Sequence, residues 1–313
     1  MDTRYIECIT DLLGKGDDRY FCNGFKHVDF EFADLTWQDK MLTGSVWCDY
    51  NWNKKKSKHL HLGTVEYIAL AASICEQMLA AEFNLSADEI ASSWISYYKM
   101  KIQTCIDLTE NKRVPISGKL ISLHKAEHGV NFYKSSFEVQ INTTVIKMEI
   151  NHPLSVWINV FTPFNGCINA HTMYYCTVYK ERNHQIRNIV LDEALMNCTA
   201  DVSIENDAAV PAGLGSQYGG TMLTDIILVS GQLVQALFYT LENIDRNQAN
   251  NLWLKEFEVY INQPDSRMDC QAKITFEDIK TLKKGDETWK SVQFKSELGS
   301  ITSKIKMVSQ INN

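Results

Sequence analysis

Two short segments carry the side chains best suited to acid–base chemistry. The first, HLHLGTVEYI at residues 59–68, contains His61 and, five residues later, Glu66. A histidine and a carboxylate that converge on one site can act as acid and base. Glu66 has a second possible role, because a carboxylate in the first turn of a helix also stabilises that helix. The segment therefore marks a candidate catalytic site with His61 and Glu66 as the reacting pair.

The second segment, TDIILVSGQLVQ at residues 224–235, offers amides and one carboxylate. Gln232 and Gln235 are three residues apart and so share one face of a helix. An amide can orient a substrate carbonyl but cannot take up a proton, and both amides could instead pair with backbone groups. Asp225 is either an acid on the approach to the helix or simply its N-cap.

Other chemistry is not indicated by the remaining motifs. The glycine-rich segment PAGLGSQYGGTM, residues 211–222, lacks the spacing and the strand–helix order of a nucleotide fingerprint. Its glycines either let the backbone approach a ligand or form a flexible turn. Cysteines and histidines show no zinc spacing, and no GxSxG elbow is present. We therefore predict no metal, no cofactor and no α/β-hydrolase mechanism.

The elements that must position these segments occur twice in the chain. Each segment begins a long apolar helix, and each helix is followed by a polar loop, a tryptophan and an alternating strand. When the strands are aligned, the side chains that share the apolar face correspond in pairs: Trp94 with Trp253, Tyr98 with Phe257, Met100 with Val259, and Ile102 with Ile261. A separate alignment of Leu62 with Leu228 sets Gln232 opposite Glu66, which predicts an asymmetry between the two copies.

The polar face of these strands also differs between the copies. Lys99 and Lys101 occupy it in the first copy, and Glu256 and Glu258 in the second. Such alternation is typical of an antiparallel sheet that is covered on one face.

Strand patterns follow and precede each helix. Those that precede are FKHVDFEF and TGSVWCDY in the first half, and HTMYYCTVY and NCTADVSI in the second. One long buried helix wrapped by a curved antiparallel sheet is the hotdog arrangement. We therefore predict an α+β double hotdog, two tandem units related by a pseudo-twofold axis. Pro153 ends the last strand of the first copy, so the units are predicted at residues 1–153 and 154–313.

Composition limits the possible partners and the compartment. A net charge of −7 argues against binding to nucleic acid or an anionic membrane. No run typical of a transmembrane helix or a secretory signal is evident. Nine cysteines, an odd number without CxxC pairs, indicate reduced thiols and a cytoplasmic location.

Three segments resemble the avirulence protein D (AvrD) family. They are DLLG with DRYFCNGFKHVDF, then HLGTVEYIALA, and finally GQLVQALFYTLENIDRNQANNLWLKEFEV. The resemblance implies a role in making syringolide-like acyl glycosides, by joining a β-ketoacyl thioester to a pentulose such as xylulose. Carried over by position, it points to His61, Thr64, Glu66, Gln232, Gln235, Asp245, Arg246, Asn250 and Trp253. Glu66 stands where relatives are expected to have Asp, which leaves the identity of the base in question.

The predicted function is acyl transfer in small-molecule biosynthesis. Glu66 and His61 would activate the sugar hydroxyl, while Gln232 and the N–H groups at the helix start would polarise the thioester carbonyl. The predicted substrate-binding residues are Thr64, Gln232, Gln235, Asp225, Arg246 and Trp253. The expected partners are an acyl thioester, carried by coenzyme A or acyl carrier protein, and a small sugar, with the chain a monomer or homodimer. A thioesterase or dehydratase, and a non-catalytic acyl-binding module, are the alternatives.

Overall fold

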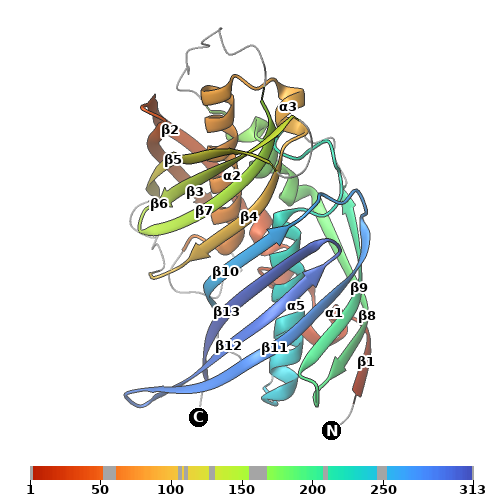
Figure 1. The fold of residues 1–313 in the computed structure, drawn as a ribbon. Coiled ribbons are helices and arrows are strands. Elements are labelled where there is room, and N and C mark those ends of the chain that lie inside the picture. Colours follow the sequence, from red (N-terminus) through yellow and green to blue (C-terminus); the bar gives the residue numbers. More distant parts are fainter. Residues whose placement is uncertain are drawn as a thin grey trace.

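Within the described residues, thirteen antiparallel strands form one sheet that wraps around two long helices (Figure 1). The computed structural model describes residues 3–51, 61–104, 108, 112–126, 131–154, 168–206, 211–244 and 252–311. The strands are β1 Thr3–Cys8, β2 Val28–Gln38, β3 Met41–Tyr50, β4 Trp94–Lys101, β5 Arg113–Lys125, β6 Phe132–Ile141, β7 Thr144–Pro153, β8 Arg182–Asp192, β9 Asn197–Asn206, β10 Trp253–Ile261, β11 Asp269–Lys284, β12 Glu287–Leu298 and β13 Ile301–Ile311. The helices are α1 Ile9–Leu13, α2 Thr64–Phe83, α3 Ala87–Ala91, α4 Tyr174–Thr177 and α5 Leu223–Leu241, with 3₁₀ turns η1 Gly16–Asp18, η2 Gly24–Lys26, η3 Ala170–Thr172 and η4 Val178–Glu181.

The order of the strands repeats on the two sides of the β4–β10 pair. From this pair outward, one side reads β4-β7-β6-β5-β3-β2 and the other reads β10-β13-β12-β11-β9-β8, with β1 added at the far edge. The register agrees with a twofold axis, because Tyr98 pairs with Val259 and Met100 pairs with Phe257. These four residues are the two pairs of equivalents that the strand alignment predicted. The double hotdog prediction is confirmed.

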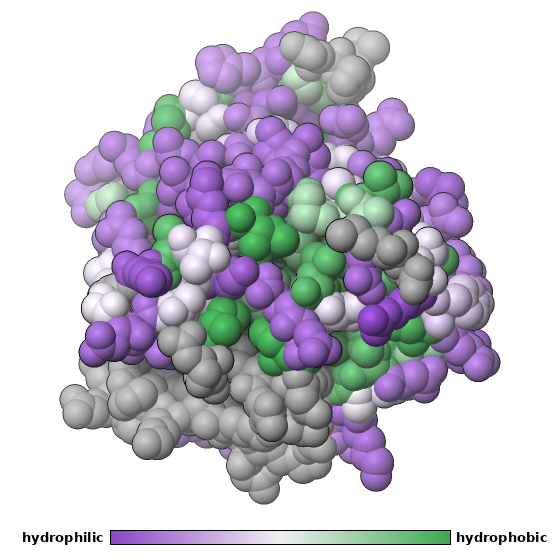
Figure 2. Space-filling view, turned by 90° about the horizontal axis from the view of Figure 1, so that it is seen from below, coloured by the Kyte–Doolittle hydropathy of each residue, from purple (hydrophilic) through white to green (hydrophobic). Residues whose placement is uncertain are grey.

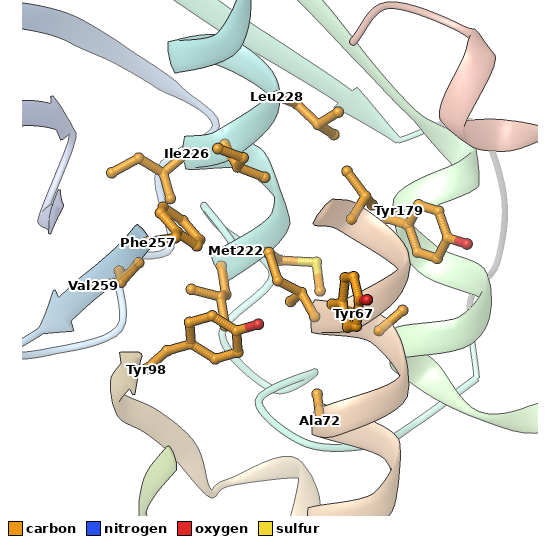
Figure 3. Close-up of a cluster of buried hydrophobic side chains, with 14 of the residues drawn as sticks. Tyr67, Ala72, Tyr98, Tyr179, Met222, Ile226, Leu228, Phe257 and Val259 are labelled. Atoms are coloured by element: carbon orange, nitrogen blue, oxygen red, sulfur yellow. The ribbon is translucent and has the colours of Figure 1, made fainter. Parts of the chain in front are cut away.

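Both long helices are buried on every side over their first turns. Every residue from Thr64 to Glu76 in α2 and from Met222 to Val234 in α5 is buried. A helix that is apolar all round belongs inside a protein, and the curved sheet supplies the cover. Figure 3 shows the resulting core between the two halves, where Tyr67 of α2 and Met222 at the start of α5 lie near Tyr98 of β4.

Ion pairs join β4 to β10 on the outer face of the sheet. Lys99 on β4 lies 3.3 Å from Glu256 and 3.2 Å from Glu258 on β10, and Lys101 lies 3.4 Å from Glu256. The lysines of one half therefore meet the glutamates of the other. Elsewhere on the surface, Figure 2 views the end of the molecule that is lowest in Figure 1 and shows hydrophilic residues around several apolar areas.

The segment HTMYYCTVY is not the strand that its sequence suggested. Residues 170–181 form η3, α4 and η4 instead. Tyr174, Tyr175 and Cys176 are buried in succession, and α4 contacts α2. A strand would turn alternate residues away from this contact, whereas a short helix buries consecutive ones. The first strand of the second half is therefore β8, which begins at Arg182.

Strand β1, the first described element, lies in the sheet of the second half. β1 pairs with β8, with Tyr5 opposite Val190, and α1 contacts α5. Strand β7 ends at Pro153. The division into units at residues 1–153 and 154–313 stays a prediction. Strand β1 and helix α1 belong to the first range but contact the second half, so they link the two halves.

Helix α5 begins at Leu223, five residues before Leu228, the residue that the alignment set opposite Leu62 near the start of the first helix. By length and composition alone this helix could cross a membrane, which corrects the expectation that no segment would. However, 89% of its most apolar window is buried inside the protein, as in the core helix of a globular protein. Among the described cysteines, Cys8, Cys22, Cys48, Cys75, Cys176, Cys198 and Cys270 are free thiols, and the cytoplasmic location stays a prediction.

Candidate functional site

The two long helices carry equivalent carboxylates in their first turns. Glu66 is the third residue of α2, and Asp225 is the third residue of α5. The interval between them equals the interval from Trp94 to Trp253, so the repeat that aligns the tryptophans also aligns these acids. The alignment of Gln232 with Glu66 was wrong, because it shifted the second helix by seven residues relative to the first, from Asp225 to Gln232. Each half thus has one buried carboxylate at its helix start.

Glu66 is fully buried beneath tyrosine side chains. The hydroxyl of Tyr20 donates a hydrogen bond of 2.5 Å to Glu66 Oε2. The hydroxyl of Tyr50 accepts a bond of 3.3 Å from the backbone N–H of Gly63, the residue that precedes the helix. Burial raises the pKa of Tyr20, Tyr50 and Tyr179 well above the usual value, and the negative charge of Glu66 raises it further. These hydroxyls therefore stay protonated and can serve as hydrogen-bond donors.

Gly63 is required by the contact between Tyr20 and Glu66. A Cβ atom at this position would overlap the Tyr20 hydroxyl and the Glu66 carboxylate. The backbone φ of Gly63 is −86°, so the requirement comes from space and not from an unusual conformation. The absence of a side chain lets the tyrosine lie over the helix start.

His61 and Trp253 join the two halves beside this helix start. Their ring centroids are 5.1 Å apart, with an angle of 40° between the planes. The equivalent indole, Trp94, packs edge-on against Tyr218, at 6.2 Å and 84°. Each tryptophan thus contacts the segment that leads into the long helix of the other half. His61, Thr64 and Glu66 all lie at the start of α2, with Trp253 next to His61, as one site would require.

Gln232 lies on α5 and forms hydrogen bonds to the segment Arg19–Phe21, which the sequence analysis did not assign to the site. Its Oε1 accepts a bond of 2.9 Å from Arg19 Nη1, and its Nε2 donates to the carbonyl oxygens of Phe21 (3.1 Å) and Leu228 (3.3 Å). The segment Arg19–Phe21 carries Tyr20, the partner of Glu66. Gln232 is thereby linked to Glu66 through protein contacts, and a role in polarising a substrate carbonyl stays a prediction.

Close packing also holds this segment against α5. A Cβ atom at Gly231 would lie 2.8 Å from the ring of Phe21, so the glycine makes room for the aromatic side chain. In the sequence, this segment was noted only because its motif DRYF is part of the resemblance to the AvrD family. The resemblance gave no role for these residues. Tyr20 is 46 residues from Glu66 along the chain, so local patterns could not indicate the contact.

Asp225 is enclosed by the side chains of Arg182 and His184. Arg182 donates to both of its oxygens, at 2.9 Å from Nε and 2.7 Å from Nη2, and His184 Nε2 lies 2.8 Å from Oδ1. The backbone N–H of Met222 also donates to Oδ2 at 2.6 Å, as in a capping box. Burial alone would raise the pKa of Asp225, but the charges of Arg182 and His184 lower it to about 2. Asp225 is therefore a structural anion and is too weak a base for proton abstraction near neutral pH.

A family model supplies the identification. The model of the Pseudomonas avirulence D protein (AvrD) matches residues 4–311, nearly the whole chain. The chain belongs to the AvrD family. Among curated proteins, none matches the sequence.

Solved structures similar to this AvrD-family chain include thioesterases and a dehydratase. The tesB protein MAP1729c of Mycobacterium avium subs paratuberculosis is 10% identical, with a TM-score of 0.44 over 88% of this chain and 96% of that one. The acyl-CoA thioesterase II TesB2 of Mycobacterium marinum is 8% identical, with a TM-score of 0.36 over 90% and 96%. The dehydratase domain from the CurK module of curacin polyketide synthase is 10% identical, with a TM-score of 0.38 over 90% and 97%.

Of the remaining candidate residues, only Gln235 lies within the part of the chain that the structure describes. Gln235 is half-buried on α5, one turn beyond Gln232. Arg246 lies outside the described residues, together with Asp245 and Asn250. Within the described residues, no group of histidine, cysteine, aspartate and glutamate side chains is arranged to hold a metal ion.

The glycine-rich segment 211–222 of this AvrD-family chain crosses from the second half to α3 of the first. The N–H of Gly215 donates to Ile90 O at 3.4 Å, and the N–H of Gln217 donates to Ala91 O at 3.1 Å. The Tyr218 hydroxyl donates to Ser92 O at 2.8 Å. Residues 211–222, called the glycine-rich strap below, therefore bind to the first half and end where α5 begins.

Proposed function

We propose that this AvrD-family chain is an acyltransferase that moves a β-ketoacyl group from a thioester to a hydroxyl of a small sugar such as xylulose. The observation that carries the proposal is the buried Glu66 carboxylate in the first turn of α2, bonded to the Tyr20 hydroxyl at 2.5 Å. Buried carboxylates beside protonated donors are suited to proton transfer in a site that excludes water.

The two equivalent helix starts differ in the chemistry available to them. Asp225 is paired with the Arg182 guanidinium and bonded to His184, whereas Glu66 is bonded to the uncharged phenol of Tyr20. A carboxylate next to a neutral donor keeps more affinity for a proton than one beside a guanidinium. This difference favours the start of α2 as the catalytic end of the molecule and gives the second half a supporting role.

In the proposed reaction, Glu66 accepts the proton of the sugar hydroxyl as its oxygen attacks the thioester carbonyl. The C–S bond then breaks, and the departing thiolate takes the proton from Glu66, so the products are an acyl sugar ester and a free thiol. The backbone N–H groups at the start of α2 would stabilise the negative charge on the carbonyl oxygen. His61, packed on Trp253, would position the sugar or share the proton transfer.

The proposal is tested with purified protein, a β-ketoacyl-coenzyme A and xylulose, with products identified by mass spectrometry. We expect an acyl sugar ester and free coenzyme A only when xylulose is present. Free β-keto acid in equal amounts with and without xylulose would show a thioesterase, and loss of water from a β-hydroxyacyl thioester would show a dehydratase. Ligand-dependent stabilisation without turnover would show a binding module.

The role of Glu66 is tested with two variants. Glu66→Gln keeps the shape and a hydrogen-bond acceptor for Tyr20 but cannot take a proton, so turnover should fall by about a hundredfold or more while the protein stays folded. Glu66→Asp keeps the carboxylate on a shorter side chain and should retain part of the activity. Full activity in folded Glu66→Gln would remove Glu66 from the mechanism.

A further inference from the structure

A cavity of about 40 Å³ lies at the start of α5, between the two halves. Its walls come from the glycine-rich strap, the first residues of β4, helix α4 and the end of β10. The aromatic lining residues are Trp94, Tyr174, Tyr175 and Tyr218. Gly219, one of the lining residues, is exposed, so the cavity borders the solvent there.

Two polar atoms of the lining are buried without a hydrogen bond. They are Nε1 of Trp94 and Oγ1 of Thr221, which find no partner within the described part of the chain. Buried polar groups in folded proteins are nearly always satisfied by protein, water or ligand. A water molecule needs roughly 10–15 Å³ of such space, so the cavity has room for about three waters or for the polar end of a ligand, but not for a whole sugar.

The cavity is the counterpart of the candidate catalytic site in the other half. In the repeat, Trp94 corresponds to Trp253, and Leu223 on the cavity wall corresponds to Thr64. The carboxylate that would complete a second catalytic site is Asp225, which is held by Arg182. The second half therefore retains a place to bind a ligand without the base needed to transform it.

We propose that this cavity is a second binding site, which takes the carbonyl end of a small neutral acyl or keto compound. An indole N–H can only donate, so the bound group must offer an acceptor oxygen to Trp94. The Thr221 hydroxyl, the other unpartnered polar group of the lining, can add a second hydrogen bond to the bound compound. The aromatic walls favour an uncharged carbon skeleton over an ion.

The site is tested by nuclear magnetic resonance on protein with ¹⁵N-labelled tryptophan, using 2-butanone as the probe. The chain has seven tryptophans, so Trp94→Phe assigns the Trp94 indole N–H signal by its loss. If that variant does not fold, the Trp→Phe variants of the other six give the assignment by elimination. We expect 2-butanone to move the Trp94 signal downfield in a saturable manner and to leave the Trp253 signal in place.

Thr221→Val removes the hydroxyl with little change in volume and should weaken this binding by about fivefold, the effect of one hydrogen bond. Thr36→Val, on the outer face of β2, is the matched control and should leave the titration unchanged. A Trp94 signal that does not move, or that drifts linearly together with all the others, would overturn the proposal and leave the cavity filled by water. Because the readout is binding at Trp94, its failure is distinct from failure of acyl transfer at Glu66.

Discussion

Lys99 of β4 and Glu258 of β10 are both direct cross-strand partners and equivalents under the pseudo-twofold axis, so the axis passes between them. Their Nζ and Oε2 atoms are 3.2 Å apart. If β4 paired with a second β4 in this register, Lys99 would face Lys99. If β10 paired with β10, Glu258 would face Glu258. The charges thus favour pairing of unlike halves over pairing of like halves.

Reversing either charge at the axis should destabilise the protein, and reversing both should restore it. Lys99→Glu and Glu258→Lys are each expected to lower the free energy of unfolding by about 1 kcal/mol, because both side chains are only partly exposed. The double variant should recover most of that loss. Urea denaturation measures all three, with Lys283→Glu in the exposed β11–β12 hairpin as control. Additive losses in the double variant would show that the pair contributes no coupling.

The ion pair between Arg182 and Asp225, at the start of α5, should be destabilising to break by substitution of either residue. Arg182→Met or Asp225→Asn leaves one buried charge without its partner and should cost about 3–5 kcal/mol. The double variant should lose much less than the sum, because it removes both charges. Thermal or urea unfolding of the three variants near neutral pH gives the coupling energy. A double variant as unstable as the sum would mean that the two side chains act independently.

Acid should weaken the same network in a defined range. The pKa of folded Asp225, about 2, lies below the ordinary value of 3.8, so its stabilising effect is present above pH 4 and is lost as the pH falls toward 2. The free energy of unfolding measured from pH 5 to pH 2 should therefore fall more steeply in the wild type than in Asp225→Asn. Parallel profiles would place the acid sensitivity in other carboxylates.

Glu76 should destabilise the protein once it ionises. Burial on α2 raises its pKa to about 7, although the N–H of Leu214, at 2.8 Å, favours the ionised form. Since the folded pKa lies above the ordinary 4.5, stability should decrease from pH 4.5 to pH 7 and change little above. Glu76→Gln mimics the neutral acid and keeps an acceptor for Leu214, so at pH 8 it should be more stable than the wild type by up to about 3 kcal/mol. Equal pH profiles for the two proteins would exclude this role.

Tyr20 should act on the chemistry more than on the fold. Tyr20→Phe removes the hydroxyl that bonds to Glu66 but keeps the ring that packs edge-on against Phe21, 5.3 Å away. We expect kcat/KM for acyl transfer to fall by about tenfold or more, with a small change in melting temperature. Tyr5→Phe, at a position 66% exposed, is the control. An unchanged kcat/KM would show that Tyr20 supports the structure alone.

Local patterns in the sequence were sufficient for the sheet and for the repeat. Alternation along residues 94–102 and 253–261 identified the buried and exposed faces, because a side-chain period of two is a property of any strand. The same alternation aligned the two copies, and the register of β4 with β10 agrees with it. The charge difference between the strands was also visible, although its pairing across the axis was not.

The helix starts were harder to predict. Residues 223–228 are apolar except for Thr224 and Asp225, so the beginning of α5 has no clear polar boundary and Asp225 was assigned to the approach. The segment HTMYYCTVY has β-branched and aromatic residues typical of strands, but the contact of α4 with α2 buries them in succession. In both cases burial in the tertiary structure overrode the local preference.

The sequence by itself determined the fold, since hydrophobic period and repetition are written along the chain and need no partner to be recognised. Only the tertiary structure decided which carboxylate is held by a guanidinium and which by a phenol. Arg182 is 43 residues from Asp225 along the chain, and Tyr20 is 46 residues from Glu66. The effect of a neighbour on a carboxylate depends on distance in space and on burial, which spacing along the chain does not encode.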